Sequence, residues 1–257
     1  MVVMDKIAYT SKLFGVSPVL KAGLALSALV FTIAVGENIF SVMVFVFMSF
    51  LCTVVSGLSL RRYAKLCLIP FWFLLLGAVT IAISVSEVAG GLLCAPFFGN
   101  YIMLTNEGLL QALNMFLKSL AGVSCLYFLY VTTPVSALLG LLDKIHTPKL
   151  MTELMMMIYR FIFILINMAE QMLTAQQARL GSSSYRASFR SFSVLASSLF
   201  VCAFQKSEQI YNSMESRGYS GEFAFTGEIK PTTAQQKVVF ILYIMVLSTA
   251  ALCAKLL

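Results

Sequence analysis

Five apolar runs dominate the pattern of hydrophobic and polar positions along the chain. A helix that crosses the hydrocarbon core of a bilayer needs about 20 mainly apolar residues, and each run approaches that length. Lys118 interrupts the fourth run, and we expect its ammonium to snorkel or to mark a contact inside a helix bundle. The predicted spans are Val19–Val35, Ile39–Val55, Cys67–Val85, Leu109–Val131 and Val238–Ala254.

Two further long helices are predicted between the fourth and fifth spans. The first begins after Thr147-Pro148 and has no Pro or Gly before Gly181. It is apolar in its first half and polar in its second. The next helix runs from Tyr185 to Ser216. Glycine commonly stops a helix at its C-terminal end, so we expect Gly181 and Gly218 to end these two helices.

Composition supports a membrane environment. The 257 residues are 60% hydrophobic and 11% charged, whereas an average soluble protein carries about 25% charged residues. Such a chain cannot cover an aqueous surface, so lipid must solvate much of it. A soluble protein with an unusually large core is the alternative, and the length of the apolar runs argues against it.

The basic residues indicate the orientation of the chain in the membrane. They precede the first span, fill the loop after the second span as Arg61, Arg62 and Lys65, and recur between Pro134 and Lys237. The other two loops, Gly36–Asn38 and Ser86–Gly108, have no Lys or Arg. Positive charge favours the cytoplasmic side, so we expect a multi-pass protein of the cell (plasma or inner) membrane with a cytoplasmic N-terminus. Because the charges sort by membrane side, the net charge of +7 does not indicate nucleic-acid binding.

The chain lacks the residues that catalysis or metal binding would need. It has no Gly-x-x-x-x-Gly-Lys-Ser/Thr loop for phosphates, a single histidine, His146, and six cysteines without a Cys-x-x-Cys pair. We therefore expect no catalytic residue, no metal ligand and no bound cofactor. Two other classes stay open: a stand-alone membrane carrier, and a membrane-embedded enzyme acting on lipid.

An arginine lies near a glycine at each predicted helix end: Arg179 near Gly181, and Arg217 beside Gly218. Arginine in a last helical turn interacts well with the negative end of the helix dipole, and ordinary capping explains either instance alone. Two such ends on the cytoplasmic side indicate a docking role more specifically than either end does alone. Because a guanidinium pairs with a carboxylate through two parallel hydrogen bonds, each end could dock into an acidic groove on a partner.

These residues carry a resemblance to a known family. "SMESRGY" around Arg217, "ARLG" at Ala178–Gly181 and the helix "TPKLMTELMMMIYRFIFILINMAEQ" resemble the transmembrane T component of energy-coupling factor (ECF) transporters, the CbiQ/EcfT family. "DKIAYTSKLFGVSPVLK" and "LRRYAKLCLIPFWFLLLG" resemble its cobalt-type branch, with the vitamin-type branch as the alternative. The first motif departs from the family's Ala-Arg-Gly pattern, since Leu180 separates Arg179 from Gly181.

The resemblance implies a non-catalytic coupling subunit of an ATP-driven importer for cobalt or nickel. The two motifs would dock onto ABC-type ATPase subunits, which bind the ATP, and a separate membrane subunit would bind the ion. The implied coupling residues are Ala178, Arg179, Gly181, Ser216, Arg217 and Gly218.

The expected fold class is therefore an all-α polytopic membrane protein with about five transmembrane helices and a helical cytoplasmic coupling region. We expect four transmembrane helices in residues 1–131 and the coupling region, with two long helices, in residues 132–236. Residues 237–257 form the last transmembrane helix.

Overall fold

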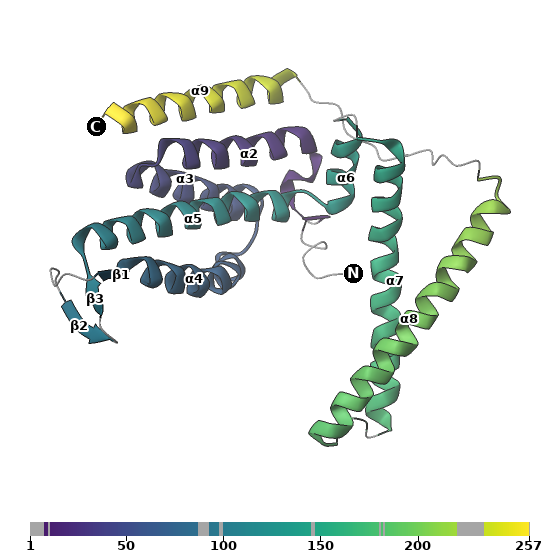
Figure 1. Ribbon diagram of the computed structural model, residues 1–257. Helices are drawn as coiled ribbons and strands as arrows, with labels where there is room; N and C mark the ends of the chain where they lie inside the picture. Colours follow the sequence, from purple (N-terminus) through teal and green to yellow (C-terminus); the bar gives the residue numbers. More distant parts are fainter. Residues whose placement is uncertain are drawn as a thin grey trace. The chain divides into compact units, whose positions relative to one another are not determined.

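The computed structural model describes residues 8–9, 11–86, 93–97, 100–144, 147–179, 181, 183–219 and 234–256. Its described elements are mostly long helices (Figure 1). They are α2 (Pro18–Val35), α3 (Asn38–Phe50) with a π-helical turn (Leu51–Val55), α4 (Leu60–Ala82), α5 (Asn106–Thr132), α6 (Val135–Lys144), α7 (Lys149–Ala178), α8 (Tyr185–Glu215) and α9 (Ala234–Leu256). His146 lies outside the described residues.

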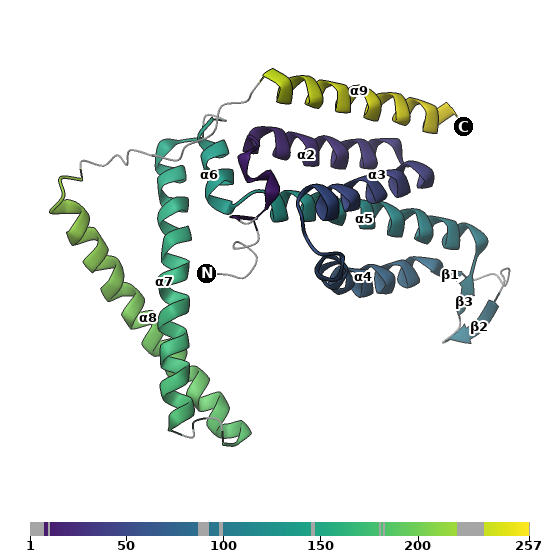
Figure 2. The same cartoon turned by 180° about the vertical axis from the view of Figure 1, so that it is seen from behind.

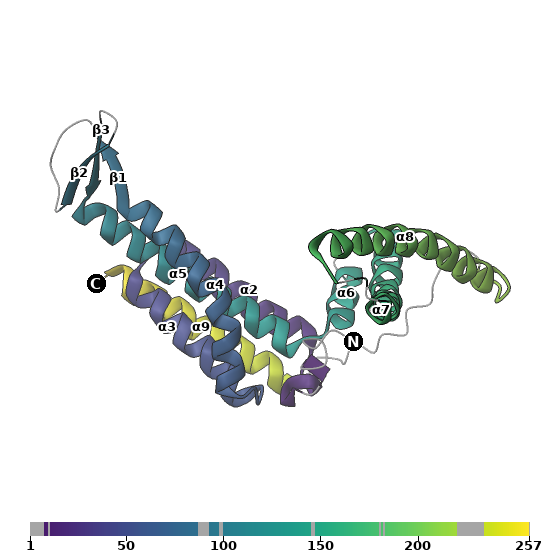
Figure 3. The same cartoon turned by 90° about the horizontal axis from the view of Figure 1, so that it is seen from below.

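The chain divides into two compact units. The membrane bundle comprises α2, α3, α4, α5 and α9, and the second unit contains α6 followed by the α7–α8 hairpin. In the bundle, α5 packs against α2, α3 and α4, while α9 packs against α2 and α3 (Figure 3). The division into residues 1–131, 132–236 and 237–257 stays a prediction.

Small side chains allow close packing inside the membrane bundle. Ala28, Ala121 and Cys125 are fully buried beside Phe40 and Met48 in one hydrophobic core. Helices in lipid gain most of their association energy from close van der Waals packing, which small residues permit. The outward faces of the same helices expose large apolar side chains, as lipid contact requires.

A lysine ammonium lies near each end of α2, where this helix runs antiparallel to α5. Lys21, in the first turns of α2, is 2% exposed, and its Nζ donates a hydrogen bond to the carbonyl of Thr132 at 2.9 Å. Thr132 is the last residue of α5, where carbonyls have no partner within the helix. At the other end of α2, a Cβ on Gly36 would lie 3.3 Å from Lys118 Nζ. Both ammonium groups therefore lie at the negative end of a helix dipole.

The prediction of an all-α polytopic membrane protein is confirmed. By length and composition, α2, α3 with its π-helical turn, α4 and α5 qualify as membrane spans, and Val238–Cys253 is a shorter apolar helix. The same criteria also admit α7 and α8, whereas the predicted fifth span corresponds to the shorter helix Val238–Cys253 and does not count. The described residues therefore hold six candidates, four of them predicted as spans, where five spans were expected. The two additional candidates arise because α7 and α8 each contain an apolar stretch within a longer amphipathic helix.

One predicted span ends too late. Cys67–Val85 was expected to be helical, but α4 stops at Ala82 and Ile83 is extended (φ −88°, ψ 108°). Strand β1 (Ile83–Ser86) follows, and β2 (Leu93–Phe97) and β3 (Asn100–Leu104) complete an antiparallel sheet of order β1-β3-β2. Ile83 pairs with Leu104 in this sheet. The β-branched Ile83 and Val85 fit a strand well, and pairing with a distant segment decided between the two structures.

Candidate coupling site

The two arginine-containing helix ends belong to the α7–α8 hairpin. Helix α7 has 30 residues and α8 has 31, and the two helices cross at an angle (Figures 1 and 2). The predicted helices after Pro148 and from Tyr185 are thus confirmed, although α8 ends one residue earlier than expected, at Glu215. Among the predicted site residues, Ala178 is the last residue of α7, and the others follow the ends of α7 and α8.

The end of α8 is a Schellman motif. The amide of Tyr219 donates to the carbonyl of Met214 at 3.1 Å, and the amide of Gly218 donates to that of Glu215 at 2.9 Å. Gly218 has φ +78°, the left-handed conformation that this motif requires and that glycine adopts without strain. The prediction that Gly218 stops this helix is therefore confirmed, and the stop is a local backbone structure.

The end of α7 repeats part of that hydrogen-bond pattern. The amide of Arg179 donates to the carbonyl of Gln176 at 3.1 Å, as Arg217 does to Met214 at 3.0 Å. Two residues further on, Gly181 donates to the same carbonyl of Gln176 at 2.9 Å, as Tyr219 does to Met214. Arg179 and Arg217 therefore occupy equivalent positions at the two helix ends.

The extra Leu180 shifts the glycine by one place. When the two helix ends are aligned on the accepting carbonyls of Gln176 and Met214, Ala178 matches Ser216 and Arg179 matches Arg217, but Gly181 matches Tyr219. Helix α7 ends at Ala178, three residues before Gly181, just as α8 ends three residues before Gly218. The expectation that Gly181 ends this helix is therefore confirmed, but Gly181 closes the last turn from the position that Tyr219 occupies in α8.

Lack of space explains glycine at position 181. A Cβ there would lie 2.6 Å from Ser191 Oγ and 3.0 Å from the carbonyl oxygen of Gln176. Ser191 Oγ donates to the carbonyl of Gly181 at 2.8 Å, and Gln176 Nε2 donates to the carbonyl of Ser191 at 3.1 Å. The sequence did not single out Gln176 or Ser191, because their contact joins residues 15 positions apart and no local pattern marks it.

The structure exposes the candidate residues and keeps the two sets apart. Ala178, Arg179, Ser216, Arg217 and Gly218 are all exposed, whereas Gly181 is partly buried. The 31 residues of α8 separate the two arginines by about 46 Å at 1.5 Å per residue. Among the described residues, neither guanidinium has a hydrogen-bond or ion-pair partner. One partner groove of ordinary size could not hold both arginines.

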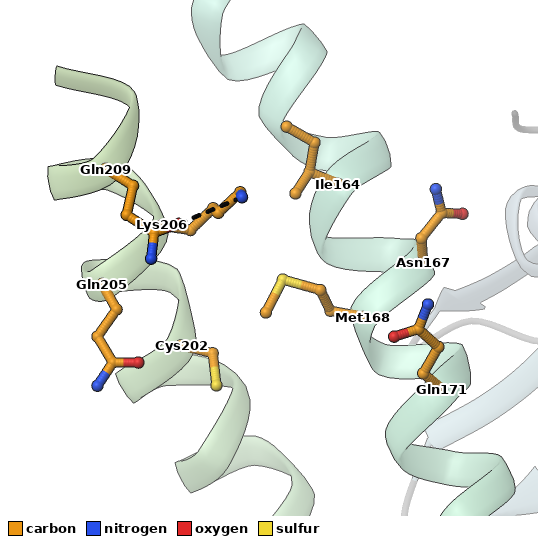
Figure 4. Close-up of a pocket in the computed structure, with 8 residues that line it drawn as sticks. All are labelled: Ile164, Asn167, Met168, Gln171, Cys202, Gln205, Lys206 and Gln209. Carbon is orange, nitrogen blue, oxygen red and sulfur yellow. Dashed lines mark hydrogen bonds between the residues drawn. The ribbon is translucent and has the colours of Figure 1, made fainter. Parts of the chain in front are cut away.

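Beyond the turn, α7 and α8 leave an open pocket of about 420 Å³. Figure 4 shows polar and sulfur-containing side chains on its two walls. Lys206 Nζ donates to Gln209 Oε1 of its own helix at 3.3 Å. The pocket is lined by Ile164, Asn167, Met168 and Gln171 of α7 and by Cys202, Gln205, Lys206 and Gln209 of α8.

A bundle of apolar helices together with a long hairpin of exposed ends defines a polytopic helical membrane protein. This chain belongs to the CbiQ cobalt transport protein family, whose family model matches residues 10–226. It is thus a membrane component of the CbiQ/EcfT group, as the sequence analysis inferred.

Individual relatives agree with this assignment. The chain is 32% identical to the cobalt transport protein CbiQ of Salmonella typhimurium, over 86% of this chain and 98% of that protein. It is 33% identical to the putative fused cobalt transport protein CbiMQ of Methanocorpusculum labreanum, over 99% of this chain but only 42% of that protein's length. Similarity extends to the energy-coupling factor transporter transmembrane protein EcfT of Brevibacillus brevis, 33% identical over 65% of each chain.

Proposed function

We propose that this chain is the transmembrane coupling subunit of an ATP-driven importer for cobalt or nickel ions. In this proposal it transmits the movement of ABC-type ATPase subunits, which bind the ATP, to a separate substrate-binding membrane subunit. It is not an enzyme and binds no metal or cofactor itself. The observation that carries the proposal is the equivalent, exposed position of Arg179 and Arg217 at two helix ends with the same hydrogen-bond frame.

Each arginine suits docking onto one ATPase subunit. An exposed guanidinium next to a small residue (Ala178 or Ser216) can approach a partner's backbone closely and pair with a carboxylate through two parallel hydrogen bonds. The separation of about 46 Å along α8 fits two grooves on two subunits. When those subunits close on ATP, they would pull the C-terminal ends of α7 and α8 in concert.

Both ends must lie on the cytoplasmic side for this mechanism. Helix α8 is long and apolar enough to cross a membrane, which would separate the arginines. However, basic residues flank both of its ends: Arg186 and Arg190 at the start, and Lys206 and Arg217 towards the end. Positive charge on both sides of a span contradicts the usual asymmetry. We therefore propose that α8 lies along the cytoplasmic membrane surface.

The first half of α7 offers a surface for the substrate-binding membrane subunit. Leu150, Leu154, Ile158 and Ile162 recur every four residues and are each more than two-fifths exposed. This spacing places them on one helix face. Movement at Arg179 would reach this apolar face through the same continuous helix. The fused relative, of which this chain covers 42%, supports a second component, because its remaining length is available for one.

The test is co-purification of the chain with candidate ATPase and substrate-binding subunits. Wild type is compared with Arg179→Glu, Arg217→Glu and the double variant. Arg190→Glu, an exposed charge reversal on the same hairpin, is the matched control. A hydrogen bond to a charged group contributes about 1.5–3 kcal/mol, so each reversal should weaken ATPase retention at least about tenfold.

The double variant should release the ATPase while the membrane partner stays bound, and Arg190→Glu should behave as wild type. Equal retention of the ATPase in all variants would reject the docking role and favour the alternative class, a stand-alone membrane carrier. Retention of a vitamin-binding subunit in place of a metal-binding one would favour the vitamin-type branch.

A further inference from the structure

The turn between α7 and α8 is closed by a ring of three hydrogen bonds. The amide of Gly181 donates to the carbonyl of Gln176 at 2.9 Å, Ser191 Oγ donates to the carbonyl of Gly181 at 2.8 Å, and Gln176 Nε2 donates to the carbonyl of Ser191 at 3.1 Å. These three residues, here called the latch, join the last turn of α7 to the second turn of α8.

The latch differs from its surroundings in burial and in space. Gln176, Gly181 and Ser191 are all partly buried, whereas Ala175, Gln177, Arg190 and Phe192 beside them in sequence are exposed. Gly181 has no room for a Cβ, which would lie 2.6 Å from Ser191 Oγ. The three residues therefore interlock sterically as well as through hydrogen bonds.

Contacts beyond the latch are few. Leu195, one turn after Ser191, is 8% exposed and is the one buried residue of the described part of α8. Further along, Met168 of α7 and Cys202 of α8 line the pocket of about 420 Å³ (Figure 4). Because a pocket replaces close packing there, the angle between the two helices depends mainly on the latch and on Leu195.

We propose that Gln176, Gly181 and Ser191 are positioning residues that set the spacing between Arg179 and Arg217. This inference rests on the proposed function. Arg179 lies between Gln176 and Gly181, both held by the latch, so its place relative to α8 is determined there. Arg217 lies 26 residues beyond Ser191.

The length of α8 amplifies any change at the latch. Those 26 residues span about 39 Å of helix, so a rotation of about 10° at Ser191 moves Arg217 by about 7 Å. A docking contact must hold its geometry within about 0.5 Å. Loss of one latch hydrogen bond should therefore spread the distance between the two helix ends and weaken simultaneous docking onto two ATPase subunits.

The variants Ser191→Ala and Gln176→Ala remove the latch side chains without touching the docking residues. Ser193→Ala is the matched control for the first, because Ser193 Oγ donates only within α8, to the carbonyl of Phe189 at 3.1 Å. Gln177→Ala is the matched control for the second, since Gln177 is exposed. Spin labels on genetically encoded amino acids at Ala175 and Asn212, both exposed, report the spacing in the full complex. ATPase retention is measured on the same samples.

Ser191→Ala and Gln176→Ala should each broaden the distance distribution by several ångström and lower ATPase affinity about fivefold, as loss of one hydrogen bond predicts. The two controls should match wild type. An unchanged distance distribution or an unchanged ATPase affinity in both latch variants overturns the inference. Failure of the proposed function appears separately, because Arg179→Glu and Arg217→Glu would then leave ATPase retention unchanged whatever the spacing does.

Discussion

Replacing Gly218 by alanine tests whether backbone conformation alone builds the end of α8. Gly218 has φ +78°, and a Cβ at this residue would meet no atom within 4 Å. The substitution therefore introduces no steric clash with a neighbour. Its entire cost comes from placing an L-residue in the left-handed region.

The expected cost is about 1–2 kcal/mol. This cost weakens two backbone hydrogen bonds: the amide of Gly218 donates to the carbonyl of Glu215, and the amide of Tyr219 donates to the carbonyl of Met214. At 1.4 kcal/mol for each factor of ten, these bonds should open about five- to thirtyfold more often in Gly218→Ala. Asparagine adopts the left-handed conformation more readily than alanine, so Gly218→Asn should recover part of the loss.

Hydrogen exchange measured by mass spectrometry on peptides covering residues 212–219 is the suitable assay. A frayed helix end accelerates the exchange of its own amides, whereas a measurement of global unfolding would not detect such a local change. Exchange should be fastest in Gly218→Ala, intermediate in Gly218→Asn and slowest in wild type. ATPase retention in the assembled complex should follow the same order, because the Schellman motif orients Arg217.

Two results would refute this reasoning. Equal exchange in the three proteins would mean that the positive φ does not limit the stability of the helix end. Faster exchange in Gly218→Asn than in Gly218→Ala would point to a constraint on side-chain volume, contrary to the open space around Gly218.

Three more predictions address the rest of the chain. Gly181→Ala should accelerate proteolysis between α7 and α8, because its Cβ would lie 2.6 Å from Ser191 Oγ and 3.0 Å from a backbone oxygen. Lys21→Met should destabilise the bundle by about 1.5–3 kcal/mol, measured by thermal unfolding in detergent, because the carbonyl of Thr132 loses a charged donor at 2.9 Å. Cysteines introduced at Ser183 and Ser213, exposed positions near the two ends of α8, should both react with a membrane-impermeant maleimide applied from the cytoplasmic side.

Each of these has a control and a contrary outcome. Adding Ser191→Ala to Gly181→Ala removes the closer contact and should slow proteolysis only in part, and full recovery to the wild-type rate would show that the contact with Gln176 has no effect. Lys65→Met, at an exposed lysine, should leave the unfolding temperature unchanged. An equal effect at both lysines would contradict a stabilising role for the hydrogen bond from Lys21 to Thr132. Labelling of Ser183 and Ser213 from opposite sides would show that α8 spans the membrane, which rules out two-ended docking.

Local patterns predicted the helices and the glycine that follows the end of α7 and of α8. The apolar runs identified α2, α3, α5 and the apolar part of α9, because a membrane span is recognisable from its length and composition. Gly218 was recognisable as a stop because a Schellman motif is built from consecutive residues. The family resemblance, carried by the segments around Arg179 and Arg217, is confirmed by the match to the CbiQ cobalt transport protein family.

Contacts between distant residues explain what the sequence did not show. The end of α4 at Ala82 depends on the pairing of Ile83 with Leu104. The burial of Lys21, which lies within an apolar run, depends on a carbonyl 111 residues away.

The sequence by itself determined the class of an all-α polytopic membrane protein and, to within one residue, where α8 stops, since both depend on neighbours along the chain. Only the tertiary structure explains why residue 181 is glycine. Ser191, ten residues further on, returns to its carbonyl and leaves no space for a side chain. Such a constraint arises when a turn brings two helices together, so it has no counterpart in the local order of residues.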